Sequence, residues 1–377
     1  MRRRQMLWSL LLLAFITACG QKPLPQPFSF IVVDDLHYAR TDDYSDTSAL
    51  DARTRRTIRQ SENNFLPLMN ELKKQAEIFQ PRPVAIFSCG DIVHGGVSDP
   101  AIQFRHFLED YNSVAMPVPL FNAMGNHEAA GEGMERAYDE AFLPFMSRET
   151  GRSLTARHFS VDFGNSHFIL LDAQPPDRRG GDHDKRIFEL MDKQWDWLKA
   201  DLEANKNKEH IFVIAHPTIW PVSSGDVWYV YDPQKQREFV DLLLEYNVRI
   251  YFGGHEHVYS VVGYENEAGK QLLQMIPDSE IPLDETEPSP PVTSYTIQNV
   301  AAGESPWAGQ LQELVRTYQD RIRYFRKTNQ AAGYFMVTVE GTRVTVEMHG
   351  ALSRKPIERY VVEAAGSRET KFSYSQP

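Results

Sequence analysis

Five short segments of the chain carry side chains of the kinds that bind metal ions, and each segment directly follows an apolar run. The segments are Asp34-Asp35-Leu36-His37, Gly90-Asp91-Ile92-Val93-His94-Gly95-Gly96, Gly125-Asn126-His127-Glu128, His216-Pro217 and Gly253-Gly254-His255-Glu256-His257. Carboxylate, amide and imidazole groups are the donors that hard and borderline divalent cations prefer. One such segment alone is more often a turn than a set of ligands. Five of them together predict a metal centre.

The apolar runs that precede these segments are predicted to be buried strands. They span residues 28–34, 84–89, 118–124, 210–216 and 248–254. The amphipathic segments between them are predicted to be helices, at residues 57–79, 99–111, 190–204 and 233–246. Strands that alternate with helices indicate an α/β architecture, in which ligands bind beyond the carboxyl ends of the strands.

Two further segments have the pattern of β-hairpins, which predicts sheets of mixed direction. Residues 158–171 contain two strand-like halves around Gly164-Asn165, and residues 334–350 repeat the pattern around Glu340-Gly341. We therefore expect two mixed sheets that pack face to face. Residues 277–292 contain five prolines and five acidic residues and are expected to form a surface loop.

The order of the five segments, D-x-H, G-D, G-N-H-E, H and G-H-x-H, resembles the motif series of the calcineurin-like metallophosphoesterases. The resemblance extends from Phe28 to His349 and includes the stretch FGNSHFILLD at 163–172. It implies a four-layer α/β/β/α sandwich of two mixed sheets, the metallophosphatase fold. It also implies an enzyme, a hydrolase that acts on phosphoric esters.

The resemblance further implies a dinuclear metal site, with two divalent ions such as Mn, Fe, Zn or Ni about 3.5–4 Å apart. The ligands of the first ion would be Asp35, His37, Asp91 and His257, and those of the second would be Asp91, Asn126, His216 and His255. Asp91 would bridge the ions, which would share the hydroxide that attacks the phosphoric ester. His127 would be the catalytic residue that protonates the leaving oxygen or stabilises the charge of the transferred group.

Several neighbouring residues have more than one possible role. Asp34 precedes the first motif directly, but Asp35 has the D-x-H spacing to His37. His94 stands where many relatives carry Asp or Asn and where purple acid phosphatases have a ligand tyrosine. With His37 present and that tyrosine absent, we do not expect a coloured Fe(III)–tyrosinate site. His94 is expected either to contact the substrate or to support a ligand.

The remaining candidates are Glu128, Trp220 and Arg179. Glu128 is expected to orient His127 or to cap the helix that follows. Trp220 lies in an aromatic-rich loop after His216, where it would stack on the substrate or, more simply, pack the loop against the sheet. Arg179 belongs to a charged loop that would bind a second phosphate or be solvated.

The N-terminus, MRRRQMLWSLLLLAFITAC, has three arginines and then an apolar run too short for a usual membrane span. We predict a signal peptide at residues 1–18. Ile16-Thr17-Ala18-Cys19 resembles the lipobox of bacterial lipoproteins, which implies a lipid on Cys19, a tether at 19–27 and an exported, membrane-anchored protein facing the periplasm or the cell surface. The alternative is an uncleaved anchor.

Residues 28–377 show no break in composition, so we predict a single domain ending in a β-hairpin.

Two functional classes are compared, a phosphoesterase and a catalytically silent binding protein. The formal net charge of -11 argues against a nucleic-acid-binding surface. A catalytically silent binding protein that retains the fold would be expected to have lost a ligand or His127, and the sequence has lost neither. The motifs leave open whether the ester is a phosphomonoester or a phosphodiester.

Overall fold

The computed structural model describes most of the chain downstream of the predicted signal and tether. The described residues are 26–173, 188–223, 225–279, 290–328, 333–350, 356–365 and 369–375. The predicted signal peptide, the predicted lipidation site at Cys19, the charged loop with Arg179 and most of the proline-rich loop lie outside the described residues. Within the described residues, none of the helices is both long and apolar enough to span a membrane.

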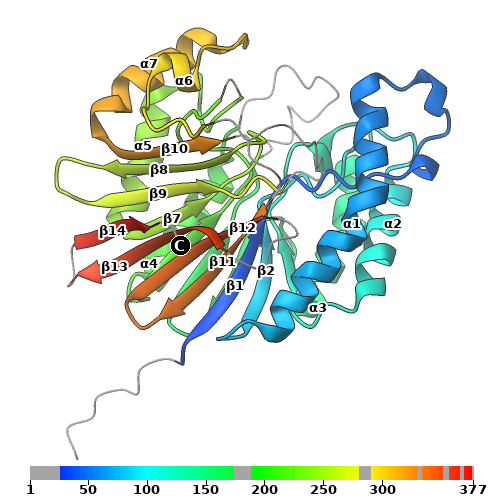
Figure 1. Ribbon diagram of the computed structural model, residues 1–377, viewed down its shortest axis with the longest axis horizontal. Helices are drawn as coiled ribbons and strands as arrows, with labels where there is room; N and C mark the ends of the chain where they lie inside the picture. Colours follow the sequence, from blue (N-terminus) through cyan, green and yellow to red (C-terminus); the bar gives the residue numbers. More distant parts are fainter. Residues whose placement is uncertain are drawn as a thin grey trace, which may run out of the picture.

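The strands of the described residues form two seven-stranded sheets, shown in Figure 1. The first sheet has the order β14 (Glu369–Ser375), β13 (Pro356–Ala365), β12 (Arg343–Gly350), β11 (Gly333–Glu340), β1 (Phe28–Val33), β2 (Pro83–Ser88) and β3 (Leu120–Asn122). The second has the order β10 (Ile322–Thr328), β8 (Tyr259–Glu265), β9 (Gln271–Ile276), β7 (Val248–Phe252), β6 (His210–Ile214), β5 (Ser166–Leu170) and β4 (Phe159–Phe163). In each sheet a parallel portion, β1-β2-β3 or β5-β6-β7-β9, continues into antiparallel strands. Both sheets are therefore mixed, as expected.

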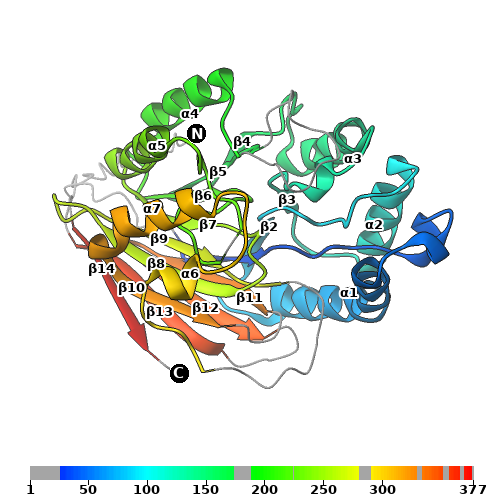
Figure 2. The same cartoon turned by 90° about the horizontal axis from the view of Figure 1, so that it is seen from above.

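Helices cover the two sheets on opposite sides (Figure 2). The first sheet carries α1 (Ala52–Ile78), α2 (Pro100–Val114) and α3 (Met134–Thr150). The second carries α4 (Asp192–Asn205), α5 (Pro233–Glu245), α6 (Ile297–Val300) and α7 (Ala308–Tyr318). The result is a four-layer α/β/β/α sandwich, which confirms the predicted fold class.

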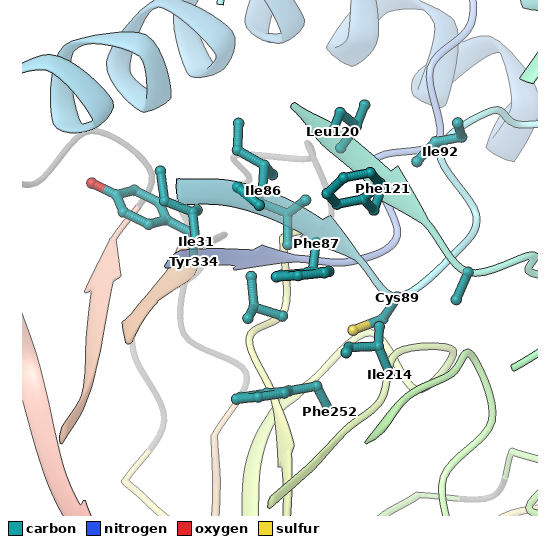
Figure 3. Close-up of a cluster of buried hydrophobic side chains, with 14 of the residues drawn as sticks. Ile31, Ile86, Phe87, Cys89, Ile92, Leu120, Phe121, Ile214, Phe252 and Tyr334 are labelled. Carbon is teal, nitrogen blue, oxygen red and sulfur yellow. The ribbon is translucent and has the colours of Figure 1, made fainter. Parts of the chain in front are cut away.

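Aromatic side chains fill the space between the two sheets. Phe30 on β1 lies edge-on to Phe168 and Phe212 of the second sheet, with ring centroids 4.9 and 5.3 Å apart. Phe87 on β2 stacks on Phe168 at 4.6 Å. Figure 3 shows the alternation along β2, with Ile86 turned toward the helices and Phe87 toward Phe252 of the opposite sheet. Because successive residues of a strand face opposite sides, β2 is apolar on both faces.

The predicted strands and helices are present, with ends that differ by a few residues. The largest difference is α1, which begins at Ala52 rather than 57 because the Asp51 carboxylate caps it by accepting from the Thr54 N–H at 2.7 Å. Both predicted hairpins form, although the second turns at Gly341-Thr342, one residue later than expected. Beyond this hairpin, β13 and β14 pair antiparallel with each other and extend the first sheet further.

A buried histidine joins the β4–β5 hairpin to α4. His167 Nδ1 lies 2.6 Å from Asp162 Oδ1, and its Nε2 lies 2.7 Å from Asp201 Oδ2. Carboxylate oxygens only accept hydrogen bonds, so both ring nitrogens donate and the ring is an imidazolium. Burial alone would lower the pKa of His167, but the bonds to Asp201 and Asp162 outweigh it and raise the pKa above 6.5.

We predict that this histidine makes the stability of the fold depend on pH above neutrality. Because the folded-state pKa is raised, the stabilisation is complete below pH 6.5 and is lost as the pH rises through the raised value. His167→Gln should lower the free energy of unfolding by roughly 2 kcal/mol at pH 6, and the difference from the wild type should shrink toward pH 9. Denaturant unfolding across this range measures it.

His158→Gln is the matched control, since burial lowers the pKa of His158 and moves its titration away from the alkaline part of this range. A difference between wild type and His167→Gln that stays constant from pH 6 to pH 9 would contradict the prediction.

Candidate metal centre

Strand ends from both sheets bring the five ligand-rich segments together. β1, β2 and β3 end there in the first sheet, and β6 and β7 end there in the second. The Asp35 N–H donates to the Gly90 carbonyl at 3.0 Å. The His37 N–H donates to the Asp91 carbonyl at 2.8 Å. Across the sheets, the His255 N–H donates to Asp35 Oδ2 at 2.7 Å. These bonds fix the segments of the two sheets against each other.

A strained backbone conformation recurs in these segments. The φ angle is positive, between 44° and 71°, at Asp35, His37, Asp91, His255 and His257. Positive φ is costly for residues other than glycine, and it accumulates at functional sites where the surroundings enforce it. The tight D-x-H and H-x-H loops thereby present alternate side chains to the same small volume.

One group of donor atoms consists of Asp35 Oδ1, His37 Nε2 and His257 Nε2. The two imidazole nitrogens lie 3.0 Å apart, and Asp35 Oδ1 lies 3.8 Å from His37 Nε2 and 3.5 Å from His257 Nε2. Asp35 Oδ1 is buried and has no hydrogen-bond partner among the described residues. Burial and the neighbouring His127 and His257 hold the pKa of His37 well below its usual range, so the ring is neutral. An unpaired carboxylate oxygen and a neutral imidazole are suitable ligands for a divalent cation.

A second group surrounds His216. Its Nδ1–H donates to the Cys89 carbonyl at 3.0 Å, which directs Nε2 toward the other members of the group. This Nε2 lies 2.8 Å from Asn126 Oδ1 and 3.2 Å from His255 Nδ1. A cation bound here would take the lone pair of Nε2 and the amide oxygen of Asn126 as ligands. The residues of this group therefore also fit a divalent ion.

The carboxylate of Asp91 belongs to both groups. Its Oδ2 lies 3.2 Å from His216 Nε2 and 3.9 Å from His37 Nε2. Its Oδ1 accepts from the His127 N–H at 2.6 Å. Burial opposes ionisation of Asp91, but the neighbouring imidazoles of His216 and His127 outweigh it and hold the pKa of Asp91 well below the usual range. Asp91 therefore has the position required of a ligand shared by two ions.

Two glycines make room for these carboxylates. A Cβ atom at Gly125 would lie 2.2 Å from Asp91 Oδ1, and one at Gly254 would lie 2.7 Å from Asp35 Oδ2. Both contacts are far inside normal van der Waals separation. The segments can approach the carboxylates only because these two positions have no side chain.

The structure corrects the prediction for Glu128, which neither orients the ring of His127 nor caps the next helix. Its buried carboxylate accepts from the N–H groups of Asp91, Val93 and Gly125, at 2.9, 3.2 and 2.7 Å. Burial and the nearby charge of Asp91 raise the pKa of Glu128 to about 7. Glu128 thus ties the G-D segment to the G-N-H-E segment and holds the backbone of Asp91 in place.

His127 lies at the accessible side of the two groups. Its Nδ1–H donates to the His94 carbonyl. Its Nε2 lies 3.9 Å from Asp91 Oδ2, and its side chain is 15% exposed. The ring of His37 meets that of His127 edge-on at 4.5 Å. This arrangement directs Nε2 of His127 toward the space in front of the donor groups, where a substrate can reach it.

The other predicted site residues lie around these groups. Asp34 is buried beside Asp35 and accepts from the Ser279 N–H at 2.6 Å. Trp220 is fully buried, stacked on Tyr264 at 5.1 Å, so it packs the loop against the sheet and does not contact a substrate. Glu256 turns away from the donor atoms and accepts from the Ser223 hydroxyl.

Phe188 could not be identified from the sequence. Its ring packs edge-on against His255 at 5.0 Å and lies 6.2 Å from the ring of His216. It is fully buried and forms the apolar wall of the second group. An isolated bridge between Phe188 and Trp228 connects this wall to the loop that follows β6. Phe188 lies between a charged stretch and a helix, where no motif distinguishes it from an ordinary core residue.

Comparisons with known proteins agree with this geometry. Residues 28–259 match the family described as calcineurin-like phosphoesterase. Purple acid phosphatase 15 of Arabidopsis thaliana is 30% identical over 158 residues, 41% of this chain and 26% of that protein. A probable cyclic nucleotide phosphodiesterase of Rhodococcus erythropolis is 23% identical over 236 residues, 62% of this chain and 66% of that protein. The chain thus spans 26% and 31% of the length of the two purple acid phosphatases that it matches.

The fold is also found among solved structures. A purple acid phosphatase from yellow lupin seeds superposes with a TM-score of 0.55 at 12% identity, over 90% of this chain and 54% of that one. This likeness shows a shared fold. The family match, in contrast, extends over more than half of the sequence and includes every segment that contributes to the two donor groups. The protein therefore belongs to the calcineurin-like phosphoesterase family.

Proposed function

We propose that the protein hydrolyses a phosphoric ester with two divalent cations, held by the donor groups of His37 and His216. The observation that carries the proposal is the single Asp91 carboxylate between these groups, 3.2 Å from His216 Nε2 and 3.9 Å from His37 Nε2. When bound, two such cations activate a water molecule as nucleophile and neutralise the oxygens of the phosphoryl group.

The residues of this chain position the two cations and supply the proton for the leaving oxygen. Asp91 and Glu128 fix the spacing of the two donor groups, because the Glu128 carboxylate holds the Asp91 N–H at 2.9 Å. His127, with its Nδ1–H bound to the His94 carbonyl, carries an exchangeable proton on Nε2 when its ring is protonated. From its partly exposed position it donates this proton to the leaving oxygen of the ester.

The ester that is hydrolysed is either a phosphomonoester or a phosphodiester. Relatives bear the names purple acid phosphatase and probable cyclic nucleotide phosphodiesterase. Both phosphomonoesters and phosphodiesters fit a two-cation site. With His37 in the first donor group and His94 in place of tyrosine, we propose Mn, Zn, Ni or Fe(II) ions rather than a tyrosinate-bound Fe(III).

We also propose that the protein is an exported lipoprotein anchored through Cys19. β1 begins at Phe28, at the end of the strand opposite to Asp35 (Figure 1). A tether that joins the fold at residue 28 therefore attaches on the side away from the metal centre. In this orientation the centre faces away from the membrane, open to soluble esters.

Hydrolysis of chromogenic mono- and diesters in the presence of Mn²⁺, Zn²⁺ or Ni²⁺ tests the proposal. We expect metal-dependent activity in the wild type and a loss of at least about 10³-fold in kcat/KM for His127→Ala with its metal content intact. Flat rates for all esters with every metal would show instead a silent protein that retains the fold.

Metal content separates the roles of two ligands. Because Asp91 lies in both donor groups, Asp91→Ala should remove both ions, whereas Asn126→Ala should mainly remove the second. Elemental analysis of the purified proteins measures this. Glu358→Gln is the matched control, since Glu358 is a buried carboxylate that accepts from the Tyr259 hydroxyl, outside the centre. Full metal content in Asp91→Ala would refute the shared ligand.

Anchoring has its own test in a bacterial host. Cys19→Ser should move the protein from the membrane fraction to the soluble fraction of the periplasm, because the thiol that carries the lipid is absent. Cys89→Ser, at a buried internal cysteine, should leave the distribution unchanged. Unaltered membrane retention of Cys19→Ser would favour an uncleaved N-terminal anchor.

A further inference from the structure

We propose that His94 is a positioning residue that holds the ring of His37 in the tautomer required by the first ion. The inference rests on the proposed two-cation site and concerns a residue that is not one of its ligands. His94 occupies the last position of the G-D-x-x-H segment, directly behind the first donor group.

His94 is the point at which three of the metal-centre segments meet. Its N–H donates to the Tyr38 carbonyl of the first segment at 2.9 Å. Its own carbonyl accepts from His127 Nδ1 in the third segment. Its ring Nδ1 lies 3.5 Å from Nδ1 of His37. Two of these contacts use the backbone and persist in any variant, so the side chain can be tested separately.

The contact between the two rings determines where the proton of His37 resides. Nε2 of His37 faces the first donor group, 3.0 Å from His257 Nε2 and 3.8 Å from Asp35 Oδ1, and must present a lone pair to an ion there. The proton of the neutral ring is therefore on Nδ1, which donates to Nδ1 of His94. Histidine ligands are commonly held in this way by an acceptor on their second nitrogen, which fixes the tautomer and the ring orientation.

The same geometry argues against direct ligation by His94. A group of potential donors includes His37, His94 and His127. In that group His94 meets His37 at Nδ1, whereas the first donor group uses Nε2 on the other side of the ring. An ion between His94 and His37 would require the lone pair of Nδ1, which a neutral ring that binds through Nε2 does not have. The side chain of His94 therefore acts through His37.

Isothermal titration of metal-free protein with Mn²⁺ tests the inference independently of any ester. We expect His94→Ala to weaken one of the two binding steps by about 10–100-fold, while the other changes by less than about threefold. His94→Asn should restore the weakened step to within about threefold of the wild type, because the amide oxygen can replace the Nδ1 acceptor. His158→Ala, at a histidine packed on Trp197, is the control.

A double-mutant cycle identifies the residue through which His94 acts. In the His37→Ala background, His94→Ala should have no further effect on the weakened step, since there is no ring left to hold. Unchanged binding in His94→Ala, equal losses in His94→Asn and His94→Ala, or additive losses in the double variant would each overturn the inference. A higher KM of His94→Ala with unaltered Mn²⁺ binding would also overturn the inference, and it would indicate that His94 contacts the substrate. A wild type that binds Mn²⁺ in two steps but has no esterase activity would refute the proposed function and leave this inference standing. In that case a weakened Mn²⁺-binding step in His94→Ala would still support the inference.

Discussion

The arrangement of this protein depends on one buried carboxylate, that of Asp91, placed between two groups of imidazole and oxygen donors. A lone anion in this environment would be strongly disfavoured by desolvation, and its neighbours are what keep it ionised. Its backbone is held by Glu128, one of its oxygens accepts from the His127 N–H, and the other faces His216 and His37. A pair of bound cations would further stabilise the Asp91 carboxylate. They would also separate the lone pairs of the ligand atoms, which otherwise face one another within each donor group.

The rest of the fold serves to bring these residues to one place. Parallel strands in each sheet end at the same edge, and the aromatic layer around Phe30 and Phe168 fixes the two sheets face to face. The loops beyond the strands then have little freedom, which is visible in the positive φ angles of the ligands and in the contacts that exclude a Cβ at Gly125. Two large clusters of buried apolar side chains lie on either face of the sheets, so the strain of the loops is supported by a stable framework.

Much of this could be predicted from the sequence, because the relevant signals are local. Each strand is a short apolar run and each motif follows it directly, so the positions of Asp35, Asp91 and His216 could be read without knowledge of the sheet order. What could not be predicted depends on three-dimensional neighbours. The position of Glu128 in the chain suggests His127 or the next helix as its partner, but two of its actual partners are the Asp91 and Val93 N–H groups, which a different strand brings close. In the same way α3, with Pro144 in its interior, is not among the helices predicted from the sequence, and Phe188 has no motif at all.

Diffraction at the Mn absorption edge from a crystal soaked in Mn²⁺ shows directly whether Asp91 lies between two ions, because anomalous scattering locates each ion irrespective of activity. We expect two peaks, about 3.5–4 Å apart, on either side of the Asp91 carboxylate. One peak beside the first donor group and another beside His216, with Asp91 in contact with both, would support the shared ligand. A single ion, or two ions neither of which contacts Asp91, would contradict it.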